Sequence, residues 1–422
     1  MEDTLKYWVW LQCSIGYANP KVNTIIRFYP SIIDFYNGGQ QEWRLCGCFP
    51  PREFKNLCNN TLDQAQQIID KCEMLGYNLL TPDMDKYPRQ LKEIYDPPAV
   101  LYVNGTLPDI DNILSIGIVG TRNATISGKK LAFSIGYDLA KSGVSVVSGG
   151  ALGIDSSSHK GALMAEGITI CVLGCGINYN YLTTNASLRK QIADNGAVIS
   201  EYPPDTPPQK YSFPKRNRII SALSQGILVV EAGEKSGALI TANTALSQNK
   251  DIFAIPGDVT NAVAFGTNTL IKQGAKAITN AAEIIEEYSG KYELTYFEPL
   301  PFSEISDSII NDIPSGRRKT VSVNQLNSLE KNNVTKGLNK LNSVKIIDNI
   351  NVKTDVKKKK KQLEYVSENT QRIYDIICEN SSTVDDIIVK TGLPVNKIMQ
   401  SLTELELDEV ITRKSGGKYI PV

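Results

Sequence analysis

The segment K-Y-S-F-P-K-R-N-R-I-I, residues 210–220, contains the densest group of side chains that could bind a charged ligand. Four cations lie within nine residues and are interleaved with Tyr211 and Phe213, ahead of an apolar stretch that predicts a helix. Cations pair with phosphate groups while aromatic rings stack on unpaired bases, and proteins that bind single strands combine the two. Lys210 and Phe213 precede the predicted helix, so we predict that both contact the ligand.

The remaining polar residues of this segment allow two interpretations. They can add phosphate contacts, or Arg216 and Arg218 can brace the fold through buried ion pairs while Asn217 ties a turn. The residue types alone do not decide between these interpretations. The candidate contacts in this group are therefore Lys215, Arg216, Asn217 and Arg218.

Small residues follow several apolar runs and would expose backbone amide groups there. Arg122 ends the segment G-T-R, where glycine allows the backbone to approach a ligand closely. The glycine-rich segment 148–155 opens directly onto a predicted helix, whose N-terminus favours anions. Asp155 is placed to cap that helix. The candidate anion-binding residues in these loops are Ser148, Gly149, Gly150, Ser236 and Gly237.

Other patterns of nucleotide chemistry are incomplete in this sequence. The first loop lacks the third glycine of G-x-G-x-x-G, and the second run ends in S-G-G instead of the acidic residue that binds an adenosine ribose. Gly128-Lys129 lacks both the upstream glycine and the following Ser or Thr of a Walker A motif. His159, the single histidine, has no nucleophile motif beside it, and we interpret it as a packing or hydrogen-bonding residue. These observations argue against a nicotinamide-dependent dehydrogenase and against ATP hydrolysis.

Four apolar runs must position these loops. They are rich in Val and Ile and are separated by segments of helical length, which predicts buried parallel strands of a βαβ sheet. Because the loops after parallel strands meet at one edge, we expect the candidate residues to lie together there. The predicted fold class is α/β, with a Rossmann-like, doubly wound, mostly parallel sheet. The runs with their loops span residues 115–123, 144–155, 226–237 and 251–257, and helices are predicted over 128–142, 156–166, 185–195 and 238–248.

The composition changes along the chain and predicts four regions. Residues 1–80 are typical of a helical domain, either helix-hairpin-helix-like (SAM-like) or a small packing domain, and residues 81–290 form the α/β domain. Residues 291–369 are rich in Asn, Ser and Lys and include a lysine run, which predicts a solvated polar linker. Residues 370–422 combine three predicted helices with a basic hairpin, the pattern of a winged helix. Lys397 is the one cation of its third helix, so contact with DNA and contact with protein both remain open.

The numbers of charged residues and cysteines in the whole chain set further limits on its function. Lys plus Arg and Asp plus Glu both number 45, and this balance argues against coating DNA through bulk charge. The closest cysteines, Cys46 and Cys48, have no second pair to complete a zinc site. The sequence shows no signal peptide and nothing near the roughly 18 apolar residues of a membrane span. We therefore expect a reduced cytoplasmic protein with no metal, no cofactor and no membrane contact.

The motifs of the central region, in their order, resemble the DNA-processing protein A family, which is also called DprA or Smf. The matching motifs are G-I-V-G-T-R-N, S-G-G-A-L-G-I-D, V-L-G-C-G, S-E-Y-P-P, F-P-K-R-N-R-I-I, S-G-A-L-I-T-A, P-G-D and G-T-N-T-L-I-K-Q-G-A. The resemblance implies a non-enzymatic protein that binds single-stranded DNA in its Rossmann-like domain. It further implies protection of incoming strands in natural transformation, loading of the RecA recombinase and a homodimer formed through the central domain.

Single residues carry over from the family only where the motifs match. The phosphate-gripping arginine of the family falls on Arg122, and its lysine and aromatic before R-N-R fall on Lys210 and Phe213. Its glycine-serine loop falls on residues 148–150 and its later Ser-Gly on residues 236–237. The alternative is a nucleotide-processing, phosphoribohydrolase-like enzyme on a related fold, which uses P-G-G-x-G-T-x-x-E. Here P-G-D and G-T-N are separated and no glutamate follows, so we prefer the DNA-binding hypothesis.

Overall fold

The computed structural model describes most of the first three hundred residues and parts of the C-terminal region. The chain divides into two compact units, Met1–Thr320 and Val321–Val422, and each is considered by itself. The described residues are 4–301, 305, 368–379, 383–394, 397–398, 401–402, 405, 410–413 and 418–421.

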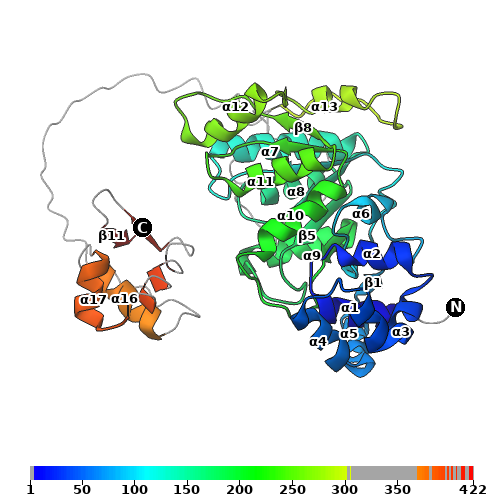
Figure 1. Cartoon of the computed structure of the whole chain (residues 1–422). Coiled ribbons are helices and arrows are strands. Elements are labelled where there is room, and N and C mark those ends of the chain that lie inside the picture. The colour runs from blue at the N-terminus through cyan, green and yellow to red at the C-terminus, as the bar shows by residue number, and fades with distance from the viewer. Residues whose placement is uncertain are drawn as a thin grey trace, which may run out of the picture. The chain divides into compact units, whose positions relative to one another are not determined.

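One mixed sheet forms the centre of the first unit (Figure 1). Its strand order is β1-β2-β6-β5-β4-β3-β7-β8-β9, with parallel pairing from β6 to β9 and antiparallel pairing of β1 with β2 and of β2 with β6. The predicted doubly wound, mostly parallel α/β sheet is thus confirmed. The strands are β1 (Asn78–Leu80), β2 (Leu101–Gly105), β3 (Ser115–Val119), β4 (Ser145–Ser148), β5 (Thr169–Leu173), β6 (Ala197–Ser200), β7 (Gly226–Val229), β8 (Asp251–Ala254) and β9 (Lys276–Ala277).

The strand order reverses between β3 and β7. The chain winds outward from β3 through β4 and β5 to β6, and then returns to place β7 on the other side of β3. In open α/β sheets, ligands bind beyond the carboxyl ends of the strands at such a switch point. The loop that carries Arg122 follows β3 and the loop that carries Ser236 follows β7, so both candidates lie at this point of the sheet.

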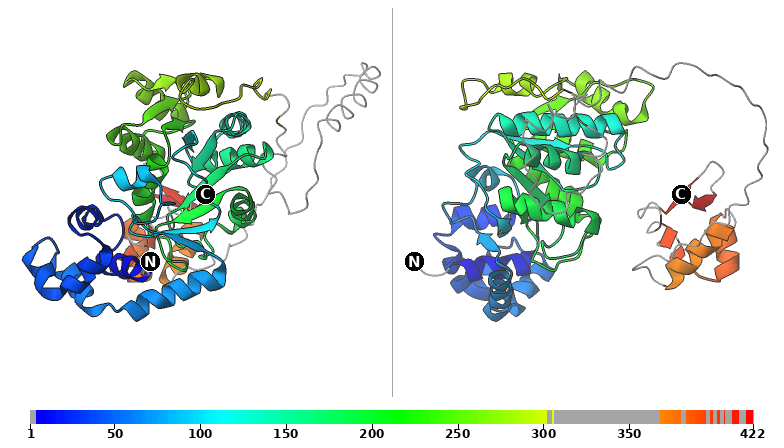
Figure 2. Two further views of the ribbon diagram at one scale, coloured as in Figure 1. Left: turned by 90° about the vertical axis from the view of Figure 1, so that its right-hand side faces the viewer. Right: turned by 180° about the vertical axis from the view of Figure 1, so that it is seen from behind.

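Helices cover both faces of the sheet (Figures 1 and 2), because neighbouring strand residues are apolar on both sides. Ile118 packs with α7 and α8 on one face, whereas the next residue, Val119, packs with α10 and α11 on the other. The four helices predicted with explicit bounds, over 128–142, 156–166, 185–195 and 238–248, are present within two residues of their expected ends. The helices of this region are α6 (Arg89–Glu93), α7 (Ile126–Lys141), α8 (Ile154–Met164), α9 (Ala186–Asn195), α10 (Ser212–Ala222), α11 (Gly237–Ser247), α12 (Phe265–Lys272) and α13 (Ala282–Glu287).

The predicted helical N-terminal region shares a hydrophobic core with the sheet. Trp10 and its neighbours pack in one cluster with Tyr102 of β2 and Leu173 of β5. Buried Gln12 fixes the contact, since its Nε2 donates to the carbonyl oxygens of Val100 (3.2 Å) and Glu201 (3.1 Å). The N-terminal region is therefore attached to the sheet through a hydrophobic core that the two share. Its helices are α1 (Leu5–Ile15), α2 (Lys21–Phe28), α3 (Ile32–Leu45), α4 (Pro51–Asn59) and α5 (Leu62–Leu75).

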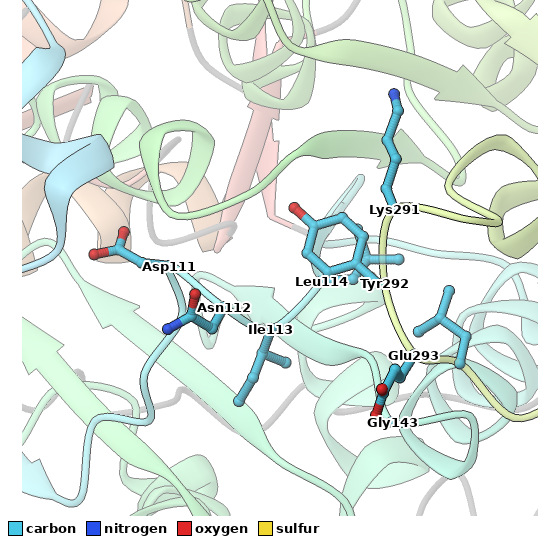
Figure 3. Close-up of a pocket in the computed structure, with 9 residues that line it drawn as sticks. Asp111, Asn112, Ile113, Leu114, Gly143, Lys291, Tyr292 and Glu293 are labelled. Carbon is cyan, nitrogen blue, oxygen red and sulfur yellow. The ribbon is translucent and has the colours of Figure 1, made fainter.

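The first residues of the predicted linker pack against α7. Ser134 Oγ donates to the carbonyl of Leu300 (3.1 Å), and the Leu300 amide donates to Asp138 Oδ1 (2.9 Å). A hollow of about 530 Å³ beside this segment is lined by residues 111–114, Gly143 and residues 291–294 (Figure 3). It opens near the amino ends of β3 and β4, so it is separate from the edge that carries the candidate residues.

The second unit contains the described parts of the predicted winged helix. Two helices, α16 (Glu368–Glu379) and α17 (Val384–Thr391), pack with Ile398, Leu402 and Leu405 in a small apolar cluster. The hairpin strands β10 (Ile411–Arg413) and β11 (Tyr419–Pro421) pair antiparallel, as the sequence predicts. The lysine run and the Gly-Gly turn of the hairpin lie outside the described residues.

Candidate nucleic-acid interface

Arg122, Phe213 and Tyr181 lie in contact with one another at the carboxyl edge of the sheet, with Phe213 between the other two. The guanidinium carbon of Arg122 lies 5.4 Å from the centroid of the Phe213 ring, within the range of a cation–π contact. The Tyr181 ring lies 5.4 Å from Phe213 with an interplanar angle of 42°. Arg122 is exposed, while both rings are half-buried. The structure thus joins Arg122 and Phe213, which are far apart in the sequence, and adds a tyrosine to them.

Phe213 belongs to the first turn of α10 instead of preceding the helix, which corrects the expectation from sequence. The turn is held by Ser212, whose Oγ bonds the carbonyl of Gly174 and accepts from the Gln209 amide (3.2 Å). A Cβ atom at Gly174 would lie 2.9 Å from the Phe213 ring, so glycine is needed for this close approach. The loop after β5 therefore packs against the Phe213 ring at the point where α10 begins.

Tyr181 is placed by an unusual segment of the loop after β5. The following residue, Leu182, has φ 48°, a left-handed conformation that is rare for a branched apolar residue. Arg189 Nη1 donates to the carbonyl of Leu182 (3.2 Å), and Asn185 Nδ2 donates to the carbonyl of Gly150 (3.1 Å). Burial raises the pKa of the Tyr181 hydroxyl, while the charge of Arg122 acts in the opposite direction. Backbone strain of this kind is frequent at binding sites.

Two exposed cations flank Phe213 in the sequence: one precedes α10 and the other lies in its first turn. Lys210 and Lys215 are exposed, and the Lys215 ammonium lies 5.7 Å from the centroid of the exposed Tyr211 ring. Lys215 also donates to the backbone carbonyl of Tyr17 in the N-terminal region (3.4 Å). These side chains can reach an anionic chain that crosses the N-terminus of α10.

The glycine-serine loop after β4 is buried, and its backbone amides already bind a carboxylate side chain of the protein itself. Ser148 Oγ donates to the carbonyl of Ile118 (2.6 Å), so this hydroxyl is engaged within the sheet. The amides of Gly149 (3.2 Å) and Ala151 (3.4 Å) both donate to Asp155 Oδ2. Burial raises the pKa of Asp155, although the amides and the nearby Arg216 favour its charged form.

The N-cap of α8 is Gly153, with φ 81°, and not Asp155 as expected from the sequence. Asp155 lies inside the first turn and points its carboxylate back to the loop instead of to the helix amides. A Cβ atom at Gly153 would lie 2.4 Å from the carbonyl oxygen of Arg122. The helix therefore starts at a glycine because the Arg122 loop passes directly over it.

Arg216 and Arg218 are both buried, with 6% and 5% exposure. Arg216 Nη1 donates to the carbonyls of Gly149 (2.7 Å) and Val172, and its Nε donates to Asn217 Oδ1 (3.2 Å). Desolvation lowers the pKa of Arg216, and Asp155 partly opposes this effect. Arg216 thus braces the glycine-serine loop through carbonyl groups and not through an ion pair, and Asn217 accepts from it instead of tying a turn.

Arg218 braces the junction with the N-terminal region. Its Nη2 donates to both carboxylate oxygens of Glu201 at 2.7 Å, and its Nε lies 3.1 Å from Asp96 Oδ2. Glu201 in turn accepts from the amide of Ala18 (3.0 Å). The residues K-R-N-R thus divide by position, since Lys215 is exposed while the three that follow are buried.

Ser236 and Gly237 occupy the start of α11, as predicted. Ser236 is the N-cap and its Oγ accepts from the amide of Ala238 (3.3 Å), while Gly237 is exposed. The loop that carries them begins with Glu231, which the sequence analysis did not identify. Its carboxylate accepts from the Thr125 amide (2.9 Å) and bonds the Thr125 hydroxyl at the N-terminus of α7. A Cβ atom at Gly128 would lie 2.3 Å from Glu231 Cδ, so Gly128 makes room for this carboxylate.

His159 has the structural role that the sequence analysis assigned to it. The ring is fully buried, and its Nδ1 lies 2.7 Å from Thr169 Oγ1. Because Thr169 Oγ1 donates its own proton to the Val146 carbonyl (2.8 Å), it accepts from the histidine. Desolvation and the charge of Arg216 lower the pKa of His159 to about 3, so the ring is neutral at physiological pH.

Tyr181 and Glu231 are the residues of this edge that sequence reasoning missed. Tyr181 lies in a polar loop without periodicity, and only the adjoining motif V-L-G-C-G marks that a strand precedes it. Glu231 is the one charged residue at the end of an otherwise apolar strand, G-I-L-V-V-E-A, and this contrast was an available signal. Among the described residues, no cluster of three or more metal-ligating side chains is present, and no helix is long and apolar enough to cross a membrane.

The fold is that of a Rossmann-like domain whose carboxyl edge carries basic and aromatic side chains. Residues 78–289 match the family described as DNA recombination-mediator protein A, and residues 357–417 match the DprA winged helix domain. The chain therefore belongs to the DNA recombination-mediator protein A family, DprA/Smf.

Individual relatives agree with this assignment. The DNA processing protein DprA of Bacillus subtilis (strain 168) is 44% identical over 245 residues, which cover 58% of this chain and 82% of that protein. Protein Smf of Synechocystis sp. is 32% identical over 356 residues, covering 84% of this chain and 82% of the relative. The X-ray structure of DNA processing protein A from Streptococcus pneumoniae matches with a TM-score of 0.60 at 30% identity, covering 68% of this chain and 99% of that one.

Proposed function

We propose that this chain binds single-stranded DNA at the carboxyl edge of its sheet. The main support is the contact of Phe213 with both Arg122 and Tyr181. The exposed cations Lys210 and Lys215 lie next to Phe213 in the sequence. Cations beside aromatic rings suit a flexible anionic chain whose bases are free to stack. A DNA duplex would not present its bases to these rings, so the arrangement favours the single strand.

The predicted contact residues differ in what they can offer to DNA. Arg122, Lys210 and Lys215 would pair with phosphates, and Phe213 would support a base or the Arg122 guanidinium. Ser236 and Gly237 border the same edge and could donate to a phosphate through α11. The remaining candidates act behind this surface and would hold it in place: Ser148, Gly149, Gly150, Arg216, Asn217 and Arg218.

The internal carboxylate at the switch point argues for binding without catalysis. Glu231 occupies the N-terminus of α7, where the phosphates of a nucleotide bind in a Rossmann fold. A free nucleotide would have to displace this carboxylate and overcome its negative charge. We therefore prefer a non-enzymatic protein without a cofactor over the alternative, a phosphoribohydrolase-like enzyme.

The family membership supports a wider role in recombination. We propose that the chain protects incoming single strands in natural transformation and delivers them to the RecA recombinase. Exposed apolar side chains on α11 and α12, Ile240, Leu246 and Phe265, offer surface for a second copy of the chain in a homodimer. The eight unpaired cysteines suit a reducing compartment, and we place the protein in the cytoplasm.

Fluorescence anisotropy of labelled oligonucleotides, single-stranded against duplex and across a salt series, tests the proposal. We expect preference for the single strand, weakening as salt rises because phosphate contacts release counterions. A truncated chain lacking residues 366–422 should keep this binding, since the proposed site lies in the first unit. Complete loss of binding in the truncated chain would contradict the proposal and assign the DNA contact to the winged helix.

A further inference from the structure

The N-terminal helical region contains a pair of thiols that the proposed DNA interface does not use. The Sγ atoms of Cys46 and Cys48 lie 3.0 Å apart, at the end of α3. Cys46 is exposed and Cys48 is half-buried, whereas the other cysteines of the described chain are half-buried or buried. One sulfur of the pair is therefore open to a reagent in solution, and the second lies directly behind it.

The turn between the two cysteines has the freedom that a bond between them requires. Gly47 has φ 64°, and a Cβ atom placed there would meet no heavy atom within 4 Å. The intervening loop is a single residue, so the second sulfur stays within reach of the first at negligible entropic cost. Forming the bond requires the two sulfurs to approach from 3.0 Å to the disulfide length of about 2.05 Å.

A hollow of about 270 Å³ opens beside the pair, and it is lined by apolar rings together with Lys21 and Glu42. Phe28 at its rim is 78% exposed, so the hollow is open to solvent. Burial, together with the neighbouring Cys46 thiol, raises the pKa of Cys48 to about 12, so Cys48 is protonated at neutral pH. The exposed Cys46 is the sulfur that an incoming compound meets first.

We infer that Cys46 and Cys48 form a reactive dithiol that is oxidised by low-molecular-weight disulfides to an intramolecular disulfide. Cys46 gives up its proton and its sulfur attacks the disulfide RS–SR, breaking that bond, forming a Cys46–SR mixed disulfide and releasing one thiol, RSH. Cys48 then gives up its proton and attacks the Cys46 sulfur, which breaks the Cys46–SR bond, forms the Cys46–Cys48 bond and releases the second RSH. Two protein thiols and one RS–SR thus give one protein disulfide and two RSH.

Oxidation of the two thiols would change the surroundings of the tryptophan residues in the adjacent core. Cys46 Sγ donates to the carbonyl of Trp43 (3.1 Å), and this bond is lost when the sulfur loses its proton. The ring centroids of Trp43 and Trp10 lie 5.5 Å apart in the buried core. All three tryptophans of the chain lie in this region, so tryptophan fluorescence is selective for it.

Peptide mass analysis of the full-length folded protein tests the inference. The protein is incubated with oxidised glutathione, free thiols are blocked with iodoacetamide, and trypsin digestion without reductant gives the peptide Leu45–Arg52, which contains both cysteines. We expect this peptide to escape alkylation and to be lighter than its reduced form by two hydrogens, with a parallel change in tryptophan fluorescence. A peptide with two alkyl groups, or with glutathione still attached, would overturn the inference.

Two variants separate the chemistry from the fold. Cys48→Ser should accumulate a stable glutathione adduct on Cys46, because no second sulfur can release it. Cys58→Ser, at a half-buried cysteine outside the pair, should oxidise like the parent protein. If Cys48→Ser formed no adduct while its fluorescence remained native, Cys46 would be unreactive and the inference would be wrong.

Discussion

The two halves of K-R-N-R show how similar side chains acquire different roles. Lys215 is exposed at the surface of α10, whereas Arg216 and Arg218 are buried and bind carbonyl and carboxylate groups of the fold. The exposed half meets solvent at the ligand edge, where salt screens its charge. The buried half is desolvated, so its interactions affect stability. A basic motif can thus combine a proposed ligand surface with the buried residues that hold this surface in place.

The buried half should show the largest effect in unfolding experiments. Arg218→Ala would leave the carboxylate of Glu201, which is 2% exposed, without its partner at the junction with the N-terminal region. We expect a loss of about 3–5 kcal/mol in the free energy of unfolding, the usual cost of breaking a buried pair on one side. Urea denaturation followed by circular dichroism measures it. Lys272→Ala removes an exposed cation on α12 and should change stability by less than about 0.5 kcal/mol.

The aromatic part of the exposed surface should show the next largest effect. Phe213→Ala removes the ring between Arg122 and Tyr181, and we expect it to weaken single-strand binding by about 1–3 kcal/mol. The slope of log affinity against log salt should change little, because no phosphate contact is deleted. Phe213→Tyr keeps the ring and is the matched control in the same anisotropy titration. Equal affinity of the alanine variant and the parent would remove Phe213 from the interface.

His159, a buried residue near the charge of Arg216, tests how stability depends on pH. Its pKa is lowered to about 3 in the folded protein, against 6.5 in the unfolded chain. Above pH 6.5 neither state is protonated; below it the unfolded chain takes up a proton that the folded protein does not. Stability is therefore lost as the pH falls from 6.5 toward 3, by about 1.4 kcal/mol per pH unit. His159→Gln should lower this pH slope in urea denaturation by the same amount. An unchanged slope would mean that the ring becomes protonated without unfolding.

The sequence predicted the sheet because the signal was local. Strands buried on both faces must be apolar at every position, and the four runs show this directly. The other five strands, β1, β2, β5, β6 and β9, were not among the predicted runs. The edge strand β1, for example, spans only Asn78–Leu80 and depends on its pairing with β2. The ends of α7, α8, α9 and α11 were accurate within two residues, whereas α10 begins before Phe213, earlier than the apolar stretch alone indicated.

The site was predictable only in its exposed part. Arg122 and Phe213 could be placed at one edge because both follow from the order of strands and helices. The burial of Ser148 could not, since it depends on the carbonyl of Ile118 in the neighbouring strand. Tyr181 joins the site through a strained loop, and no periodic pattern marks such a loop. Whether a residue of a motif lies at the ligand surface or supports it from behind thus depends on partners in other helices and strands. The motif itself does not contain these partners.

Arg122 allows the finest test of the comparison between the exposed and the buried half. Arg122→Ala should remove one phosphate contact and reduce the salt slope of single-strand binding by about one. Lys210→Ala should do the same, and Lys272→Ala, on α12, should leave the slope unchanged. Arg122→Lys keeps the charge but loses the planar group over Phe213, so it should retain the slope and lose affinity. If Arg122→Ala bound as tightly as the parent at every salt concentration, its guanidinium would belong with the supporting residues and not with the surface.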